Sequence, residues 1–252
     1  MPKEATPLIA QISDRLITAI ATGEFLPGSR LPAERDLAVL LHVGRTSVRA
    51  ALAVLHERGL IETQRGRGGG SFVRVQWTAD SHAAVARTLQ ARWGDIEDRL
   101  EAMRSLHGAI ARAAAEHRDD DDVVVLEQRR EEYRAAASGR PKQSADASLH
   151  SAISDAAKNG TLQSMLLSLE REISIGAPRH VWGEPDGMAA SEERALREHD
   201  RLVAAIVERR PDDADVIARD HARIDLELLE AALHRAERTA LAVQGGASGT
   251  DR

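Results

Sequence analysis

Residues 30–73 read RLPAERDLAVLLHVGRTSVRAALAVLHERGLIETQRGRGGGSFV, and this stretch decides the fold. An apolar stripe on a first short helix precedes a turn at residues 42–44 and a second helix that begins at Arg45. Gly44 suits this turn because glycine tolerates unusual backbone angles and is an acceptable N-cap. Gly59 ends the second helix, and two short strands follow, at residues 60–63 and 71–75. This order of elements predicts a winged helix-turn-helix.

The outer face of the second helix predicts a contact with DNA. The inward face is apolar and consists of Val48, Ala51, Leu52 and Leu55. The N-terminal end and the outer face carry polar side chains, namely Arg45, Thr46, Ser47 and Arg49. A helix fits the major groove, where its first turn reaches base edges or phosphates and an arginine can donate two hydrogen bonds to one guanine.

The loop between the two strands predicts the tip of a wing. It reads Arg65-Gly66-Arg67-Gly68. Its glycines allow a close approach of the backbone to a duplex, and its arginines suit phosphates or a narrow minor groove. Such a loop on its own is more often a solvated loop. Next to this pair of helices, it favours DNA binding.

The amino-acid composition indicates which residue types build the hydrophobic cores and in which cellular compartment the protein is expected. The chain has 252 residues, enough for two domains, and 42% of them are apolar but only 2% are aromatic. The cores are therefore built from Leu, Ile, Val and Ala, as in helical bundles. No apolar run approaches the ~20 residues of a membrane span. With a polar N-terminus and no cysteine, we expect a cytoplasmic protein that has no signal peptide, no disulfide and no membrane partner.

The net charge of −6 is unevenly distributed along the chain. Residues 1–76 contain ten Lys and Arg against seven Asp and Glu, a balance of +3, which leaves −9 for the remainder. Local charge is what meets phosphate. The first part of the chain is therefore the predicted DNA-binding part, and the acidic remainder is not.

Beyond residue 80, helical periods dominate, and the fold class is mainly α. We expect a DNA-binding domain at residues 1–76, a linker at 77–80, an all-helical effector-binding and dimerisation domain at 81–238, and a disordered tail at 239–252. The second domain has six or seven helices, with candidates at 81–92, 95–118, 121–138, 142–157, 160–175, 189–209 and 212–238. We expect residues 176–188, which are rich in Gly and Pro, to form a long loop, and Trp182 to fill a pocket or lie at an interface.

A second constellation of residues predicts a metal site. Asp146 and His150 are four residues apart and share one face of a helix, and His199 and His221 lie in later helices. One carboxylate and three imidazoles suit Zn, Ni, Mn or Fe ions, and helical bundles build such sites from facing helices. Spacing alone leaves open an Asp–His pair on a helix surface, because the chain has ten histidines.

Residues 8–75 resemble the DNA-binding domain of the GntR family of bacterial transcription regulators. The family block R-L-P-S-E-R-x-L-A matches residues 30–38 with Ala33 in place of serine, and V-S-R-x-x-V-R-x-A-L matches residues 43–52 with Gly44 in place of serine. Both departures remove a hydroxyl that caps a helix or touches phosphate. The resemblance implies DNA contacts by Arg35, Arg45, Arg49 and Gly66.

Residues 95–236 resemble the all-helical effector domain of the FadR subfamily, called FCD. The block D-x-x-x-H-x-x-x-x-x-A-x-x-N matches Asp146, His150, Ala156 and Asn159, the E-H pair matches Glu198 and His199, and the final histidine matches His221. The resemblance implies the metal ligands Asp146, His150, His199 and His221, and effector contacts by Arg104 and Asn159. A family glutamate expected shortly after Arg104 is absent, and His107 and Gly108 stand there. Members with all four ligands are similar to metal-dependent sensors of small carboxylates.

Together these features predict a ligand-responsive bacterial transcription regulator, of the repressor type, that binds an inverted-repeat operator in double-stranded DNA as a homodimer. Its helical domain would bind a divalent metal ion and a small organic acid. Two alternatives remain: a metal-dependent helical-bundle enzyme with a DNA-binding tether, and a regulator for which the metal itself is the signal. We expect no enzyme, because no further carboxylate has a clear general-base role.

Overall fold

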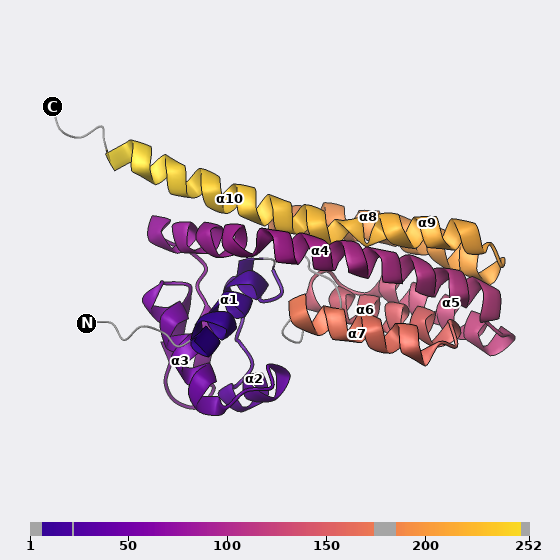
Figure 1. The fold of residues 1–252 in the computed structure, drawn as a ribbon, viewed down its shortest axis with the longest axis horizontal. Helices are drawn as coiled ribbons and strands as arrows, with labels where there is room; N and C mark the ends of the chain where they lie inside the picture. Colours follow the sequence, from indigo (N-terminus) through magenta and orange to yellow (C-terminus); the bar gives the residue numbers. More distant parts are fainter. Residues whose placement is uncertain (1–6, 22, 174–184, 248–252) are drawn as a thin grey trace. The chain divides into compact units, whose positions relative to one another are not determined.

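The computed structural model describes residues 7–21, 23–173 and 185–247 (Figure 1). Contacts within the chain divide it into two units, residues 1–94 with 229–252, and residues 95–228. The long helices α4 (Ala79–His117) and α10 (Arg223–Ala247) contribute residues to each unit. This division differs from the predicted linker at 77–80, because residues 79–94 are the beginning of α4. The predicted loop residue Trp182 lies outside the described residues.

The first unit is a winged helix-turn-helix, as the sequence predicts. It contains α1 (Pro7–Ala21), α2 (Glu34–Leu40), α3 (Arg45–Glu57), β1 (Ile61–Gln64) and β2 (Gly70–Val73). The two strands pair antiparallel, with Ile61 opposite Val73, and Arg30 forms an isolated bridge to Phe72. We call α3 the recognition helix and residues 65–69 the wing loop.

The turn between α2 and the recognition helix differs from the prediction in one detail. The left-handed backbone angle lies at His42, with φ 54°, and not at Gly44, which is extended and forms the N-cap of α3. The amide of Val43 donates to the carbonyl of Ala38 at 3.0 Å, which closes α2 before the chain turns. The recognition helix ends as predicted, because Gly59 follows it with φ 69°. The amide of Leu60 then donates a hydrogen bond to the carbonyl of Leu55.

The wing loop depends on a glycine that the sequence pattern did not single out. A Cβ at Gly69 would lie 2.4 Å from the carbonyl oxygen of Gln64, a separation that carbon atoms do not adopt. Gly66 has φ 101°, and its carbonyl accepts a hydrogen bond from the amide of Gly69. Glycine is therefore needed at the tip for close packing as well as for conformation.

Apolar side chains at helical spacing hold the first unit together. In the recognition helix the predicted inward residues Val48, Ala51, Leu52 and Leu55 are all buried. They face a core that also includes Leu16, Ile17, Leu37, Leu60, Ile61 and Val73. Burying aliphatic side chains is the main stabilising term here, at about 1.5–3 kcal/mol for each fully buried Val or Leu.

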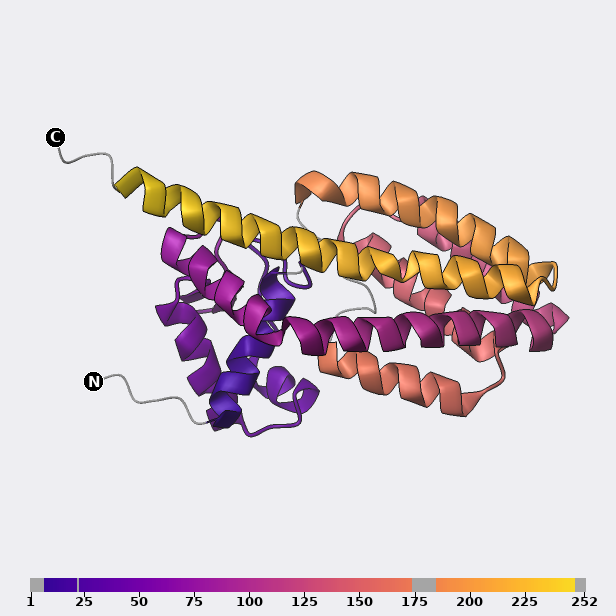
Figure 2. The same ribbon diagram turned by 45° about the horizontal axis from the view of Figure 1, so that its top comes forward.

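The second unit is a helical bundle, as the sequence predicts. Besides its part of α4 it contains α5 (Asp120–Ala135), α6 (Arg140–Ala156), α7 (Gly160–Ile173), α8 (Pro185–Val207) and α9 (Pro211–His221). In Figures 1 and 2, α7 and α8 lie on opposite sides of the part of α4 that belongs to this unit. Fully buried side chains include Tyr133, Leu126 and Leu149, and Asp119 caps α5 through a reciprocal hydrogen bond with Asp122.

Three predicted helix boundaries were wrong. The helices expected at 81–92 and 95–118 are one helix, α4, because Gly94 lowers helix propensity by only about 1 kcal/mol and does not terminate a packed helix. The helix expected at 212–238 is two helices, α9 and α10, with a break at Ala222. Helix α10 also continues to Ala247, so residues 239–247 are helical where a disordered tail was expected.

Within the described residues, no single helix is both long and apolar enough to cross a membrane. Helices α2 and α3 meet the length and composition test only when they are taken together, as a pair bent by 108°.

Candidate metal centre and DNA-binding surface

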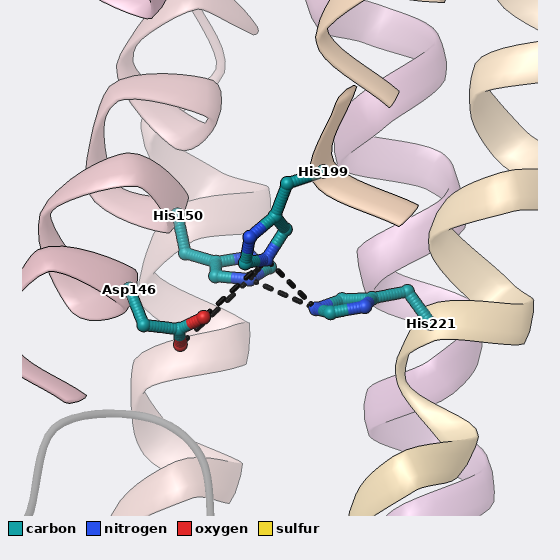
Figure 3. A group of neighbouring side chains, drawn as sticks. All are labelled: Asp146, His150, His199 and His221. Atoms are coloured by element: carbon teal, nitrogen blue, oxygen red, sulfur yellow. Dashed lines mark hydrogen bonds and ion pairs between the residues drawn. The ribbon is translucent and has the colours of Figure 1, made fainter. Parts of the chain in front are cut away.

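Four polar side chains meet in the interior of the second unit, as Figure 3 shows. Helix α6 supplies Asp146 and His150, α8 supplies His199, and His221 is the last residue of α9. All four are buried, with His199 fully so. Residues from three helices thus converge on one point, as the sequence predicted. We call these four residues the Asp/His cluster.

The Nε2 atoms of the three histidines lie very close together. The separations are 3.2 Å between His150 and His221, 3.3 Å between His150 and His199, and 3.1 Å between His199 and His221. Asp146 Oδ1 lies 3.3 Å from His199 Nε2, and Oδ2 lies 4.0 Å from His150 Nε2. Three N–H groups cannot point at one another at these distances, so lone pairs must face the shared space.

These separations fit a shared cation. Metal–nitrogen bonds of about 2.0–2.1 Å place two nitrogens about 3.3 Å apart at a tetrahedral angle and about 2.9 Å apart at a right angle. The three observed nitrogen separations, 3.1–3.3 Å, lie between these values. One carboxylate and three imidazoles also match the donors that divalent transition metals prefer. The Asp/His cluster is therefore a buried site compatible with a metal ion.

A carboxylate that the sequence analysis gave no role lies behind His221. Glu198 Oε2 is 2.8 Å from His221 Nδ1, and Glu198 Oε1 accepts from Arg194 Nε, also at 2.8 Å. Burial alone would raise the pKa of Glu198, but the hydrogen bonds from His221 and Arg194 outweigh it, and the pKa lies below its usual value. Glu198 therefore remains ionised at neutral pH. The only signal for it in the sequence was its place directly before His199.

Two aromatic side chains border the Asp/His cluster. The ring of Tyr133 meets the ring of His199 edge-on, with centroids 4.6 Å apart, and its hydroxyl donates to the backbone carbonyl of Glu192. Burial, with the nearby charges of Asp146 and Glu192, raises the pKa of Tyr133, which therefore stays protonated. The ring of His107 lies edge-on to His150, at 5.6 Å. Spacing could not reveal either neighbour, because both lie on other helices.

The two predicted effector contacts differ in position. Arg104 donates from Nε to the backbone carbonyl of Arg219, two residues before His221, and pairs with Glu101 at 2.9 Å. It therefore lies beside the helix end that carries a cluster residue. Asn159 is exposed, and its side chain accepts from the amide of Leu162 at the start of α7. That position does not support its predicted role in effector binding.

Beside Arg104, helix α4 approaches α9 closely at Gly108. A Cβ at this position would lie 2.1 Å from Asp215 Oδ1 and 2.8 Å from two atoms of Arg219. The departure from the family pattern at residues 107–108 therefore has a structural consequence. It lets the ion pair between Asp215 and Arg219 pack directly against α4.

The predicted DNA contacts lie at the surface of the first unit. Most of them are exposed: Arg35, Arg45, Thr46, Arg49, Arg65, Gly66 and Arg67, with Ser47 half-buried. Arg49 is held by Glu34 of α2, which accepts from Nη2 at 2.8 Å and from Nε at 3.1 Å. This pair lowers the pKa of Glu34. Arg35 instead contacts its neighbour Asp36 at 3.2 Å.

A winged helix-turn-helix joined to a helical bundle with a buried Asp/His cluster defines a class of protein, the two-domain transcription regulators. The chain belongs to the GntR family of these regulators. Residues 8–71 match the family described as bacterial regulatory proteins, gntR family, and residues 98–224 match the FCD domain. The resemblance to a GntR regulator of the FadR-like subfamily is thereby confirmed.

Named relatives agree with this assignment. The chain is 30% identical over 213 residues to the putative HTH-type transcriptional regulator RmpR of Mycobacterium gastri, covering 84% of this chain and 76% of that protein. It is 28% identical over 233 residues to the Glc operon transcriptional activator of Escherichia coli K12, covering 88% and 89%. These relatives are regulators and not enzymes, as expected for this chain. A solved GntR structure from Streptococcus agalactiae is 24% identical, covers 86% of this chain and 97% of its own, and has a TM-score of 0.42.

Proposed function

We propose that this regulator binds an inverted-repeat operator as a homodimer and releases it when a small carboxylate binds a divalent metal ion in the helical domain. The observation that carries the proposal is the convergence of three imidazole Nε2 atoms within 3.3 Å of one another beside Asp146. Buried imidazoles at such distances favour a cation between them.

The number of protein donors limits which ions can also bind an effector. Asp146, His150, His199 and His221 offer four ligand atoms. A tetrahedral zinc ion would then have no position left, whereas a six-coordinate ion would keep two for a chelating acid. We therefore favour Ni, Mn or Fe, or zinc with an expanded shell. The metal supplies a positive centre for the acid, and the protein residues fix its place.

The position and the chemistry of Arg104 also support a small acid as the effector. Arg104 lies beside the end of α9 and offers a guanidinium that can bind a carboxylate in two places. One Escherichia coli relative, 36% identical over 109 residues, is named a putative L-lactate dehydrogenase operon regulatory protein. L-lactate is a hydroxy acid of the size that two coordination positions hold. The match covers 42% of this chain and 42% of that protein, so the choice of a small acid rests on the chemistry of Arg104 and the Asp/His cluster.

For the operator, the proposal rests on the exposed arginines. Arg45 and Arg49 lie on the first two turns of the recognition helix, and Arg65 and Arg67 lie in the wing loop. Two copies of so small a reading surface are needed for a site of useful length, which is why we expect a dimer. Light scattering on the full chain should give twice the mass of 27.4 kDa. A monomer at micromolar concentration would contradict this part.

One experiment separates the effector hypothesis from its alternative. Operator duplex is selected from a random pool and titrated with the full chain after chelation, after reloading with Mn²⁺, Ni²⁺ or Zn²⁺, and again with a panel of hydroxy and dicarboxylic acids. Release by an acid only in the metal-loaded protein supports the proposal. Release by metal alone would make the metal the signal. If the metal-free protein still releases the operator fully in response to an acid, both the metal-dependent acid sensor and the direct metal sensor would be contradicted.

The proposed direction of regulation needs its own measurement, because one relative is named an activator. We expect repression, since a protein that leaves its operator on binding an effector relieves repression in the simplest case. A reporter gene behind the selected operator would show it. Lower expression when the regulator is supplied, restored by the acid, is the expected result, and higher expression would make it an activator.

A further inference from the structure

Helix α8 carries both a cluster residue and the residue that contacts the next one. His199 enters the Asp/His cluster, while Glu198, its neighbour in sequence, reaches His221 at the end of α9. Glu198 is not a member of the cluster itself. It touches His221 at Nδ1, whereas the cluster is built on His221 Nε2. The two nitrogens of one ring therefore have different partners.

The contact between Glu198 and His221 Nδ1 decides which nitrogen of the His221 ring carries the proton and which carries the lone pair. A neutral imidazole carries one N–H and one lone pair, and an ionised carboxylate only accepts hydrogen bonds. At 2.8 Å from Glu198, Nδ1 must therefore be the protonated atom. The lone pair is then on Nε2, which faces His150 and His199. A hydrogen bond to one nitrogen of a histidine in general sets which nitrogen binds a metal.

Arg194 holds Glu198 in this orientation. Its Nε donates to Glu198 Oε1 one helical turn away, so both carboxylate oxygens are engaged, and its Nη1 pairs with Glu227 of α10. The side chain of Glu198 is 15% exposed. A second Arg/Glu pair on the same helix, Arg197 with Glu193, has the same spacing but a glutamate that is 73% exposed and touches no cluster residue in the described structure.

We propose that Glu198 is a positioning residue of the metal centre, which fixes His221 as an Nε2 ligand, and that Arg194 keeps Glu198 aimed at it. This inference rests on the proposed function for the presence of a metal, but the choice of ring nitrogen precedes metal binding. A carboxylate that accepts a hydrogen bond from one ring nitrogen makes the other ring nitrogen a better electron-pair donor to a metal ion. Loss of the carboxylate lets His221 adopt the other tautomer, in which Nε2 carries the proton.

The test compares Glu198→Gln and Glu198→Ala with Glu193→Gln in the full chain. Nitrogen-15 NMR of labelled histidines, with His221→Gln for assignment, reads the tautomer of His221 without metal. Competition against a chromophoric chelator reads the affinity for Zn²⁺. We expect Nδ1–H for His221 in the wild type and in Glu193→Gln, a shift toward Nε2–H in both Glu198 variants, and zinc affinity lower by about 10- to 100-fold. Glu198→Asp should recover part of the loss.

The outcomes separate this inference from the proposed function. A wild-type protein that binds no divalent metal ends the proposed function, while the NMR of the metal-free protein still decides the role of Glu198. If the Glu198 variants fold, as judged by circular dichroism, and keep both the wild-type tautomer and the wild-type zinc affinity, the inference is overturned. An equal loss of affinity in Glu193→Gln would also overturn it, because a general change of charge on α8 would then suffice.

Discussion

The functional side chains of the two units differ in their exposure to water. The arginines of the recognition helix and wing loop are exposed, whereas the Asp/His cluster is buried between helices. An exposed arginine keeps its hydration until phosphate replaces it, so such a surface exists without a partner. Buried imidazoles and a carboxylate that converge on one point form a donor set that suits a cation. In this molecule, the DNA-binding residues are open to solvent, whereas the residues of the candidate metal centre lie in the interior.

Within the exposed set, Arg49 differs from the others. Both carboxylate oxygens of Glu34 accept hydrogen bonds from Arg49, Oε1 from Nε and Oε2 from Nη2, so the guanidinium has a preferred direction before DNA binds. Such preorganisation lowers the entropy lost on binding. Within the described residues Arg45 forms no such ion pair, and it is the first residue of the helix. The comparison predicts graded effects of substitution, which should be largest in the buried cluster.

The largest effect is expected from His199→Ala, because His199 is fully buried and lies within 3.3 Å of the three other cluster residues. Bound metal should fall from one equivalent per chain to none. The stabilisation by metal should also vanish, which is about 2.7 kcal/mol when free metal is 100 times its dissociation constant. Elemental analysis and thermal unfolding measure both.

The control is His117→Ala, which changes an exposed histidine in the last turn of α4. It should bind metal as the wild type does. Operator binding should survive in both variants, because the recognition helix is untouched. Full metal binding by His199→Ala would show that the cluster is not the site.

Next in size are Arg45→Ala and Arg49→Ala, at the start and on the outer face of the recognition helix. If each loses a bidentate contact to a base, affinity for the operator should fall about 5- to 150-fold, with little change on a scrambled duplex. Gel-shift titration against both duplexes measures this. An unchanged operator affinity would show that the substituted arginine does not contact a base in the major groove.

Arg67→Ala in the wing loop should have a smaller effect of a different kind. A phosphate contact is blind to sequence, so both duplexes should be bound more weakly by a similar factor. The slope of log affinity against log salt should become less steep by about 1. Repeating the titrations over a range of salt tests this. A loss confined to the operator would instead assign Arg67 to a base.

The smallest effect is expected from Glu34→Gln. The pKa of Glu34 is lowered by Arg49, so the pair stabilises the fold above the ordinary glutamate value of 4.5 and loses that contribution as pH falls below it. Because the pair is exposed, the contribution is small and screened by salt. At pH 7 we expect Glu34→Gln to unfold at a midpoint close to that of the wild type. We also expect it to lose less operator affinity than Arg49→Ala loses. An equal or larger loss would give Glu34 a contact of its own with DNA.

The sequence predicted best those features that neighbours in the chain determine. The helix pair, the wing and the end of the recognition helix at Gly59 follow from local spacing and turn residues. The same local reasoning failed at Gly94, which interrupts a sequence pattern without interrupting α4, and at Ala222, where the apolar period continues through a break. Packing between helices decides such points, and no local pattern contains it.

The cluster shows where the remaining limit lies. Its members lie up to 75 residues apart in the sequence, from Asp146 to His221, and periodicity indicates only that Asp146 and His150 share a face of one helix. The family resemblance brought the four together, and the structure places them within reach of one ion. It could not place Asn159, which caps α7 at the surface, or reveal that Glu198 reaches His221. Those contacts depend on how α7, α8 and α9 are packed.

The N-caps of both helix-turn-helix helices lead to a further consequence. Ala33 before α2 and Gly44 before the recognition helix have no side-chain group that can accept a hydrogen bond. The first amides of these helices must therefore be satisfied by water in the free protein, or by phosphate oxygens on DNA. Fraying of the first turn competes with operator binding, and the observed affinity falls in proportion to the fraction of molecules in which the turn is formed. The local stability of these two first turns thus contributes to the strength with which a gene is controlled.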